Sequence, residues 1–326
     1  MIDKYYNGVI EQVYNHVGTT EKNIVMANYN NDFSIKNLET VKRYRAQMDS
    51  VFFASREFGY RELTGAYEPF LDTICDMFRA YGTGDFDTFL DGCGVYELHK
   101  EILRSYYESG ICKRNENVLL NEVAYEQNRM TDAMAAMLKA LAKEHPLMLV
   151  INRFQMASRS TFELVHDLIT HPDKNIGLVL GVNDSVGRKE SVADVWDRIV
   201  ESLKDRSQLY HIGSSDHRRT EIAREHVLGE GYTDNVDVDE DYEASIQKVS
   251  NIVEFLDYDQ AKRYFREVEY QIKFEDARMK NASRRAFYLL YAKTSILLGE
   301  LSKALELLTE AKNLIPAEYE FKYRAE

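Results

Sequence analysis

The stretch Glu144-His-Pro-Leu-Met-Leu-Val-Ile-Asn-Arg-Phe-Gln-Met-Ala-Ser158 decides the fold class of this chain. Residues 147–151 form an unbroken apolar run, which is typical of a parallel strand covered on both faces. A long helical pattern over residues 123–143 leads into this run, and two polar residues, Asn152 and Arg153, follow it. A helix that delivers the chain into a doubly covered strand predicts an α/β protein with a parallel sheet.

Four further apolar runs have the length of strands, and helical patterns separate them. Helices of this length between strands are the connections that parallel strands need. We therefore predict a five-stranded parallel sheet flanked by helices. The remaining strands are expected at residues 23–27, 51–55, 176–182 and 208–212, and the helices at about residues 37–47, 67–81, 161–170 and 192–203.

The strand signal stops near residue 213, and only helical patterns follow the acidic stretch 233–241. In the last two predicted helix pairs, Ala261 and Ala304 take equivalent positions, where a small side chain lets antiparallel helices approach closely. Repeated helix pairs predict an α-solenoid, although their spacing exceeds the tetratricopeptide period of about 34 residues. The four helices are expected at residues 242–255, 258–274, 283–298 and 302–314.

These patterns predict a division into an α/β domain with a helical extension, a short linker and a repeat domain. The α/β domain is expected at residues 1–232, the acidic linker at 233–241, and the helical repeats at 242–326. Two helix pairs seldom bury enough surface alone, so we expect the repeats to continue beyond residue 326.

Composition restricts the classes of function. The net charge of −13 disfavours a nucleic-acid partner for these residues. Three widely spaced cysteines argue against a disulfide scaffold or a zinc site. The amino terminus has no apolar signal region, and no apolar stretch approaches about 18 residues, the length of a membrane span. We therefore expect a cytoplasmic protein without a membrane partner.

Two motifs carry a resemblance to a known family. The run His145-Pro-Leu147, the strand after it and Phe154-Gln-Met-Ala-Ser158 resemble the third-strand region of the AAA-like ATPase domain of STAND-type signalling proteins. The stretch Gly65-Ala-Tyr-Glu-Pro-Phe70 is similar to that family's Tyr-x-Pro-Phe motif. The resemblance covers residues of about 20–225. It implies a P-loop NTPase-like sheet which, as in bacterial regulators, is followed by tetratricopeptide-like repeats.

The resemblance places a degenerate phosphate loop at residues 30–37. Lys36 falls on the lysine position, whereas Asn30 and Ile35 replace the two glycines and Asn37 replaces the magnesium-binding hydroxyl. A β-branched residue such as Ile35 resists the backbone conformations that cradle a phosphate. Lys36 therefore has two interpretations, a remnant phosphate ligand or a surface lysine in the first turn of a helix.

The positions of the family's magnesium-binding acids are also changed. Asn152 and Arg153 stand there, and a neutral amide and a cation cannot hold the metal. Asn183 ends the fourth predicted strand, where the family often has a sensor residue, and it either contacts phosphate or caps a loop. We expect no catalytic residue, no metal site and no cofactor, apart from residual ATP or ADP binding at these positions.

The joint loss of these elements predicts a catalytically inactive, P-loop NTPase-like signalling or regulatory scaffold. It would bind a protein partner or an attached output domain through its helical repeats. An alternative is an ATP-binding switch of a bacterial signal-transduction or transcription regulator. In that switch Lys36 holds the nucleotide, and Glu163, Asp167 or an acid from another subunit replaces the lost residues. A third possibility is a sensor whose crevice holds another small molecule.

Aromatic residues recur on the predicted repeat helices, and two roles stay open for them. They either form the core between paired helices or line a concave groove for a partner. The residues are Tyr258, Tyr264, Phe265, Phe287, Tyr288 and Tyr291.

Overall fold

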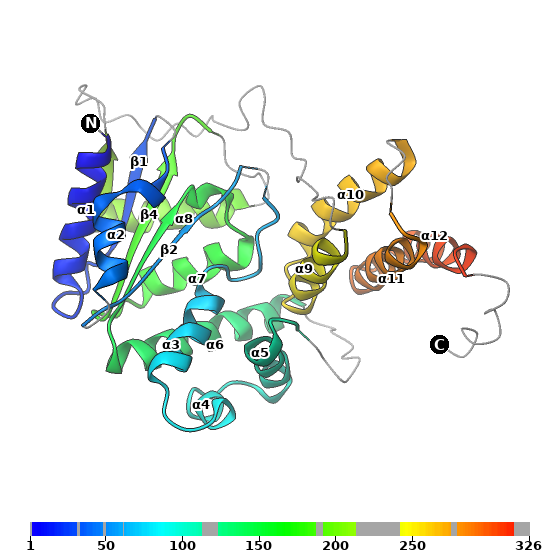
Figure 1. The fold of residues 1–326 in the computed structure, drawn as a ribbon, viewed down its shortest axis with the longest axis horizontal. Coiled ribbons are helices and arrows are strands. Elements are labelled where there is room, and N and C mark those ends of the chain that lie inside the picture. Colours follow the sequence, from blue (N-terminus) through cyan, green and yellow to red (C-terminus); the bar gives the residue numbers. More distant parts are fainter. Residues whose placement is uncertain are drawn as a thin grey trace.

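A parallel five-stranded sheet forms the centre of the α/β part of the chain in the computed structural model (Figure 1). Its strand order is β2-β3-β4-β1-β5. The strands are β1 (Ile24–Tyr29), β2 (Phe52–Glu57), β3 (Leu147–Asn152), β4 (Ile176–Asn183) and β5 (Leu209–Ile212). The structure describes residues 2–30, 33–47, 50–60, 62–112, 123–186, 192–212, 242–274 and 279–315.

The three inner strands are buried along their whole length, whereas the two edge strands are only partly buried. This burial explains why strands β1, β3 and β4 read as continuous apolar runs, since both of their faces are covered. The stretch 144–158 forms the end of helix α6 (Val123–Glu144), strand β3 and the turn that follows. The expected α/β class with a parallel sheet is therefore confirmed.

Helices α1 (Ile2–His16) and α2 (Glu39–Ala46) cover one face of the sheet. Their apolar side chains form one core with Val25, Met148 and Val179, which point to this side of their strands. Helix α1 was not predicted from the sequence. Its buried residues Tyr6, Val9, Ile10 and Val13 nevertheless follow the spacing of one helix face.

The opposite face is covered by helices α3 (Phe70–Tyr81), α6, α7 (Arg159–Thr170) and α8 (Ala193–Asp205). Alternate residues of the same strands, such as Leu149 and Leu178, enter this second core. Two helices that the sequence analysis did not predict, α4 (Phe86–Gly92) and α5 (Glu97–Ser109), extend this layer.

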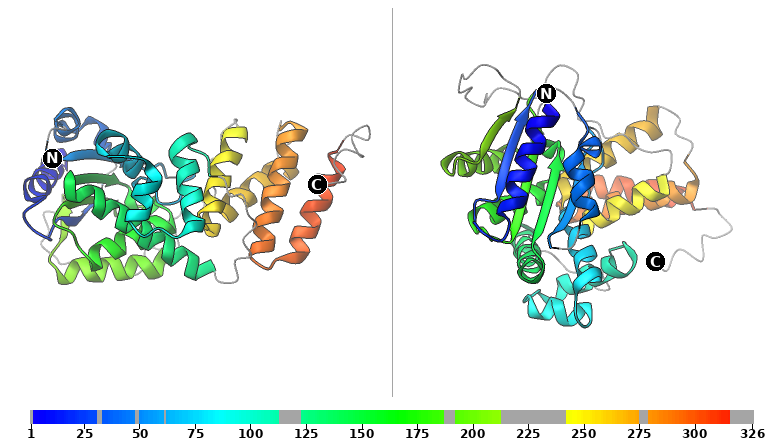
Figure 2. Two further views of the ribbon diagram at one scale, coloured as in Figure 1. Left: turned by 90° about the horizontal axis from the view of Figure 1, so that it is seen from below. Right: turned by 60° about the vertical axis from the view of Figure 1, so that its left-hand side comes forward.

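Four helices beyond residue 241 form an array that leads away from the α/β part (Figure 2). They are α9 (Tyr242–Glu254), α10 (Tyr258–Phe274), α11 (Asn281–Leu297) and α12 (Leu301–Asn313). All four were predicted within a few residues of these bounds. Ala261 and Ala304 are both buried, in agreement with the small-residue positions expected between paired helices.

The recurring aromatic side chains of the array form its core. Each has an exposed fraction of 8% or less, so the structure favours the core role over an open partner groove. They are Tyr258, Tyr264, Phe265, Phe287, Tyr288 and Tyr291.

The predicted acidic linker 233–241 lies outside the described residues, so the domain boundaries stay a prediction. Within the part of the chain that the structure describes, no helix combines the length and the apolar character needed to cross a bilayer.

Candidate functional site

The carboxyl ends of the strands meet at one edge of the sheet and define the candidate site. Tyr29 is paired with Asn183, and Glu57 with Asn152, so these strand ends lie level with one another. The chain leaves β1 towards the β2 edge of the sheet, whereas it leaves β4 towards β5 on the other side of β1. Open α/β sheets bind ligands outside the strand ends where the connections diverge in this way. We call this place the crevice.

The loop after β1 places its predicted ligand residues towards solvent. Lys36 and Asn37 are exposed in a short 3₁₀ turn (Ile35–Asn37), whereas the side chain of Ile35 is only 1% exposed and belongs to the core under α1 and α2. Asn30 is also exposed, and its carbonyl oxygen accepts a hydrogen bond of 2.5 Å from the Ser185 hydroxyl. This arrangement agrees with the surface interpretation of Lys36.

A carboxylate of the chain itself occupies the inner side of this loop. The Glu57 Oε2 atom accepts hydrogen bonds from the Ile35 backbone N–H at 2.8 Å and from the Ser34 hydroxyl at 3.0 Å. Its Oε1 atom lies 3.4 Å from the Arg153 guanidinium. The side chains of Glu57 and Arg153 are 10% and 15% exposed, so water screens this ion pair only weakly. The Ile35 N–H and the Ser34 hydroxyl, which could otherwise bind an external anion, are thus hydrogen-bonded to the Glu57 carboxylate.

Asn152, at the end of β3, uses both its side-chain oxygen and its side-chain nitrogen in hydrogen bonds within the protein. Its Oδ1 atom accepts a hydrogen bond of 2.7 Å from the Tyr29 hydroxyl. Its Nδ2 atom donates to the carbonyl oxygen of Phe33 at 3.2 Å. The side chain is fully buried, so it ties the loop after β1 to the centre of the sheet.

Arg153 turns away from the strand with a backbone φ of 55°. Its guanidinium donates to the Phe58 carbonyl oxygen at 3.1 Å and lies 4.6 Å from the centre of the Tyr60 ring. Together with the ion pair to Glu57, these contacts fix Arg153 to the segment that follows β2.

Asn183 acts as a cap at the end of β4. Its Oδ1 atom accepts from the Ser185 backbone N–H at 3.0 Å, and its Nδ2 atom donates to the Tyr60 hydroxyl at 2.8 Å. Gln155 donates its side-chain N–H to the Asn183 carbonyl oxygen at 3.1 Å. The structure therefore brings Asn152, Arg153 and Asn183 together at the crevice, but each is engaged by neighbours within the chain.

Three aromatic rings fill the space beside Asn152. The ring centres of Tyr29 and Phe33 are 4.7 Å apart, and Tyr6 from α1 packs edge-on against both rings. Burial, followed by the proximity of Tyr29 and Glu57, raises the pKa of Tyr6 well above its usual value. Gly181 is needed here, because a Cβ atom on it would lie 2.7 Å from Asn152 Oδ1 and would overlap the Tyr6 hydroxyl.

These contacts are a poor match for magnesium and a triphosphate. A phosphate cradle needs free backbone N–H groups, yet the Ile35 N–H points at Glu57. A magnesium ion needs carboxylates, yet the carboxylate of Glu57 at the end of β2 is already hydrogen-bonded to the loop and paired with Arg153. The residues described at the crevice therefore do not fit this ligand as they stand.

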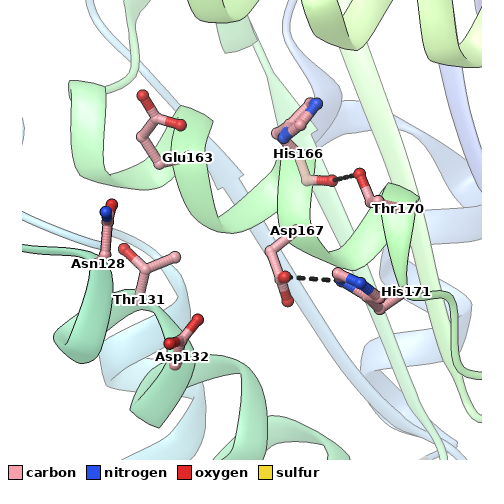
Figure 3. Close-up of a pocket in the computed structure, with 8 residues that line it drawn as sticks. All are labelled: Asn128, Thr131, Asp132, Glu163, His166, Asp167, Thr170 and His171. Carbon is pink, nitrogen blue, oxygen red and sulfur yellow. Dashed lines mark hydrogen bonds and ion pairs between the residues drawn. The ribbon is translucent and has the colours of Figure 1, made fainter.

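A separate groove of about 180 Å³ lies between helices α6 and α7 (Figure 3). Two of its acids have partners, since Glu163 pairs with Arg198 at 3.1 Å and Asp167 Oδ1 lies 2.9 Å from His171 Nδ1. Burial and the nearby Arg198 lower the pKa of His166. Glu163 and Asp167, considered above as replacement acids, thus line this groove together with Asn128, Thr131, Asp132, His166, Thr170 and His171. No cluster of acids, histidines and cysteines suited to a metal ion occurs in the described ranges.

Comparisons with models of protein families, with curated proteins and with solved structures found no match to this chain.

Four residues at the crevice were not predicted from the sequence, namely Glu57, Tyr6, Tyr29 and Phe33. The predicted second strand ended at residue 55, whereas β2 continues to Glu57. A polar residue at the end of a parallel strand is a usable signal for a site, so the two-residue error hid Glu57. Tyr6 lies on the helix that was not predicted, and no local pattern points from it to β1.

Proposed function

We propose that this chain is a non-hydrolysing, P-loop NTPase-like regulatory scaffold that binds a protein partner through its helical array. The observation that carries the proposal is the hydrogen-bonded carboxylate of Glu57 on the loop after β1. In this interpretation Glu57 stands where a nucleotide phosphate would lie, and Asn152 stands where a magnesium ligand would lie. Phosphoryl transfer depends almost entirely on the positioning of the phosphate and on charge stabilisation by the metal. A chain without the phosphate position and the magnesium ligand therefore lacks the means of hydrolysis.

The outer helix of the array supports a role in protein binding. Leu301, Leu305 and Leu308 of α12 are 67%, 69% and 41% exposed and share one side of the helix at spacings of four and three residues. A neighbouring side of α12 carries Ala304 and Leu307, which are buried in the array. Exposed leucines at helical spacing suit an amphipathic helix of a partner. We call these three leucines the α12 stripe.

Nucleotide binding by the purified full chain tests the first part of the proposal. We expect titration calorimetry with Mg·ATP to give no saturable heat at millimolar nucleotide, and a phosphate-release assay to give no turnover above buffer. Saturable binding that Lys36→Ala abolishes would instead favour the ATP-binding switch. Turnover at rates ordinary for ATPases would contradict the proposal outright.

Site-specific photo-crosslinking in cells tests the second part. A photoreactive residue at position 305 is expected to give a discrete crosslinked product. The same residue at Glu310, exposed on a different side of α12, serves as the matched control and should not give this product. Identical products from both positions, or no product at 305, would count against a partner on the α12 stripe.

A further inference from the structure

The turn between α9 and α10 joins the helical array to the α/β part. It consists of Phe255, Leu256 and Asp257, all of them buried. The backbone of Leu256 has a positive φ of 65°, which is uncommon for a bulky residue and directs successive side chains apart. We call this turn the joint.

Neighbouring residues of the joint enter different cores. Phe255 belongs to the core on the α7 side of the sheet, and its ring meets Tyr67 and Tyr106 edge-on at centre distances of 5.9 and 6.3 Å. Leu256 belongs to the core of the helical array. In the opposite direction, Leu63 from the segment between β2 and α3 is buried in the array core. Each part therefore completes its core with a residue of the other.

Hydrogen bonds connect the same surfaces. The Asp257 carboxylate accepts from the Ser160 hydroxyl at 2.9 Å and from the Ser160 backbone N–H at 3.4 Å. It thereby places a negative charge at the amino-terminal end of α7, where a helix favours one. The Leu256 carbonyl oxygen accepts from the Gln127 side chain of α6 at 2.6 Å.

Asn251 of α9 adds two further bonds on the other side of the joint. Its Oδ1 atom accepts from the Cys112 backbone N–H at 2.9 Å, and its Nδ2 atom donates to the Gly110 carbonyl oxygen at 2.8 Å. The carboxyl-terminal end of α5 is thus tied directly to α9.

The Tyr-Glu-Pro-Phe motif that begins at Tyr67 builds the receiving side. Tyr67 has a φ of 55°, its backbone N–H donates to the Ser160 hydroxyl at 3.0 Å, and its hydroxyl lies 3.0 Å from that of Thr131. Ser160 therefore contacts both the motif and Asp257 of the joint. The motif thus has a structural use in this chain, since its tyrosine holds the surface on which Phe255 rests.

We propose that the joint makes the α/β part and the helical array one cooperative folding unit with a fixed relative orientation. Parts of one chain usually move relative to each other unless the interface between them is apolar and well bonded. Here the exchanged core residues and the hydrogen bonds of Asp257 and Asn251 supply such an interface. The array is then held out as a rigid platform and does not swing on a tether.

Urea unfolding followed by two probes tests this proposal on the full chain. Trp196 is the single tryptophan and packs against Phe154 and Phe162, so its fluorescence reports on the α/β part. Far-UV ellipticity reports on the helices of both parts. Phe287→Ala removes a fully buried ring of the array core and provides the perturbation.

We expect both probes to give the same midpoint in the wild type, and Phe287→Ala to lower both midpoints equally. In the joint variant Phe255→Ala/Asp257→Ala, adding Phe287→Ala should lower only the midpoint of an array transition seen by ellipticity. A Trp196 midpoint unaffected by Phe287→Ala alone would overturn the proposal. So would equal shifts of both probes in the joint variant. If the combined variant does not fold, the comparison of the wild type with Phe287→Ala decides.

Discussion

At the scale of single residues, the side chains at the crevice bind one another. Glu57 and Asn152 both hold the loop after β1 against the sheet end, and Arg153 holds the segment after β2. Buried polar groups must be paired, and a network in which every member is paired is stable and specific. The polar side chains at the crevice therefore stabilise the fold.

Glu57→Gln is expected to lower the free energy of unfolding by about 1–3 kcal/mol, the range for removing a charged partner from a buried hydrogen bond. The Arg153 guanidinium would keep its burial but lose its counter-ion. Urea unfolding at neutral pH measures the effect. Glu11→Gln, in the exposed pair with Arg43, is the control and should change the free energy by less than about 0.5 kcal/mol. Equal changes in the free energy of unfolding for the two variants would show that the contacts of Glu57 do not stabilise the loop after β1.

Gly181→Ala is expected to cost about 1–3 kcal/mol, because the new methyl group overlaps the Tyr6 hydroxyl. The hydroxyl has no hydrogen-bond partner among the described residues, so Tyr6→Phe alone should be nearly neutral. Tyr6→Phe/Gly181→Ala should then recover part of the loss, and thermal unfolding of the four proteins gives the coupling energy. Strict additivity would mean that the two residues do not compete for this space.

The position of a side chain in the fold could be predicted from the sequence where it directly follows a strand end, whereas its role as a ligand residue stays a prediction. Asn152 and Asn183 lie at the ends of β3 and β4, which the long apolar runs indicated, and the family resemblance marked these two positions as a site. Glu57 lies on β2, an edge strand whose burial falls off after its first two residues, so the apolar pattern ends before the strand does. Tyr6 reaches the crevice through packing between distant segments, which no local pattern encodes.

At the scale of elements, the five strands and most of the helices between them were predicted from the sequence, but α1, α4 and α5 were not. Helix α4 has only seven residues and ends at Gly92, so it is too short for helical periodicity to stand out. Two groups of helices were predicted well, those with long amphipathic patterns and those of the array. The array was predicted because its helices carry regular apolar spacing with polar turns between them.

Helix α12 allows a test of how its two sides contribute to stability, because Leu305 is exposed on one side and Leu307 is buried on the other. Leu305→Glu should change the free energy of unfolding by less than about 0.5 kcal/mol, because its side chain is already in water. Leu307→Ala should cost about 2–5 kcal/mol, because Leu307 is 1% exposed. Urea unfolding at two protein concentrations measures both effects. A large loss in Leu305→Glu that grows with protein concentration would mean that the α12 stripe is buried between copies of the chain.

At the scale of the whole molecule, the joint joins two architectures that the sequence analysis treated as separate. The pattern of strands followed by helices correctly indicated two kinds of packing. It could not indicate that Phe255 completes the core of the sheet side, or that Leu63 completes the core of the array. Such exchange depends on which surfaces meet after folding, and apolar periodicity carries no information on that.

A fragment of residues 242–326 provides the corresponding test. We expect it to have less helix per residue than the full chain and a broad thermal transition, because Phe255, Asp257 and Asn251 lose their partners and Leu63 is missing from its core. Helical arrays are stabilised by the sum of their neighbouring interfaces, so removing the interface beside α9 weakens the whole array. Far-UV ellipticity against temperature measures this, with the fragment carrying Phe255→Ser as a control for aggregation through the exposed ring. A sharp transition at the midpoint of the full chain, in both fragments, would show that the array folds independently of the sheet.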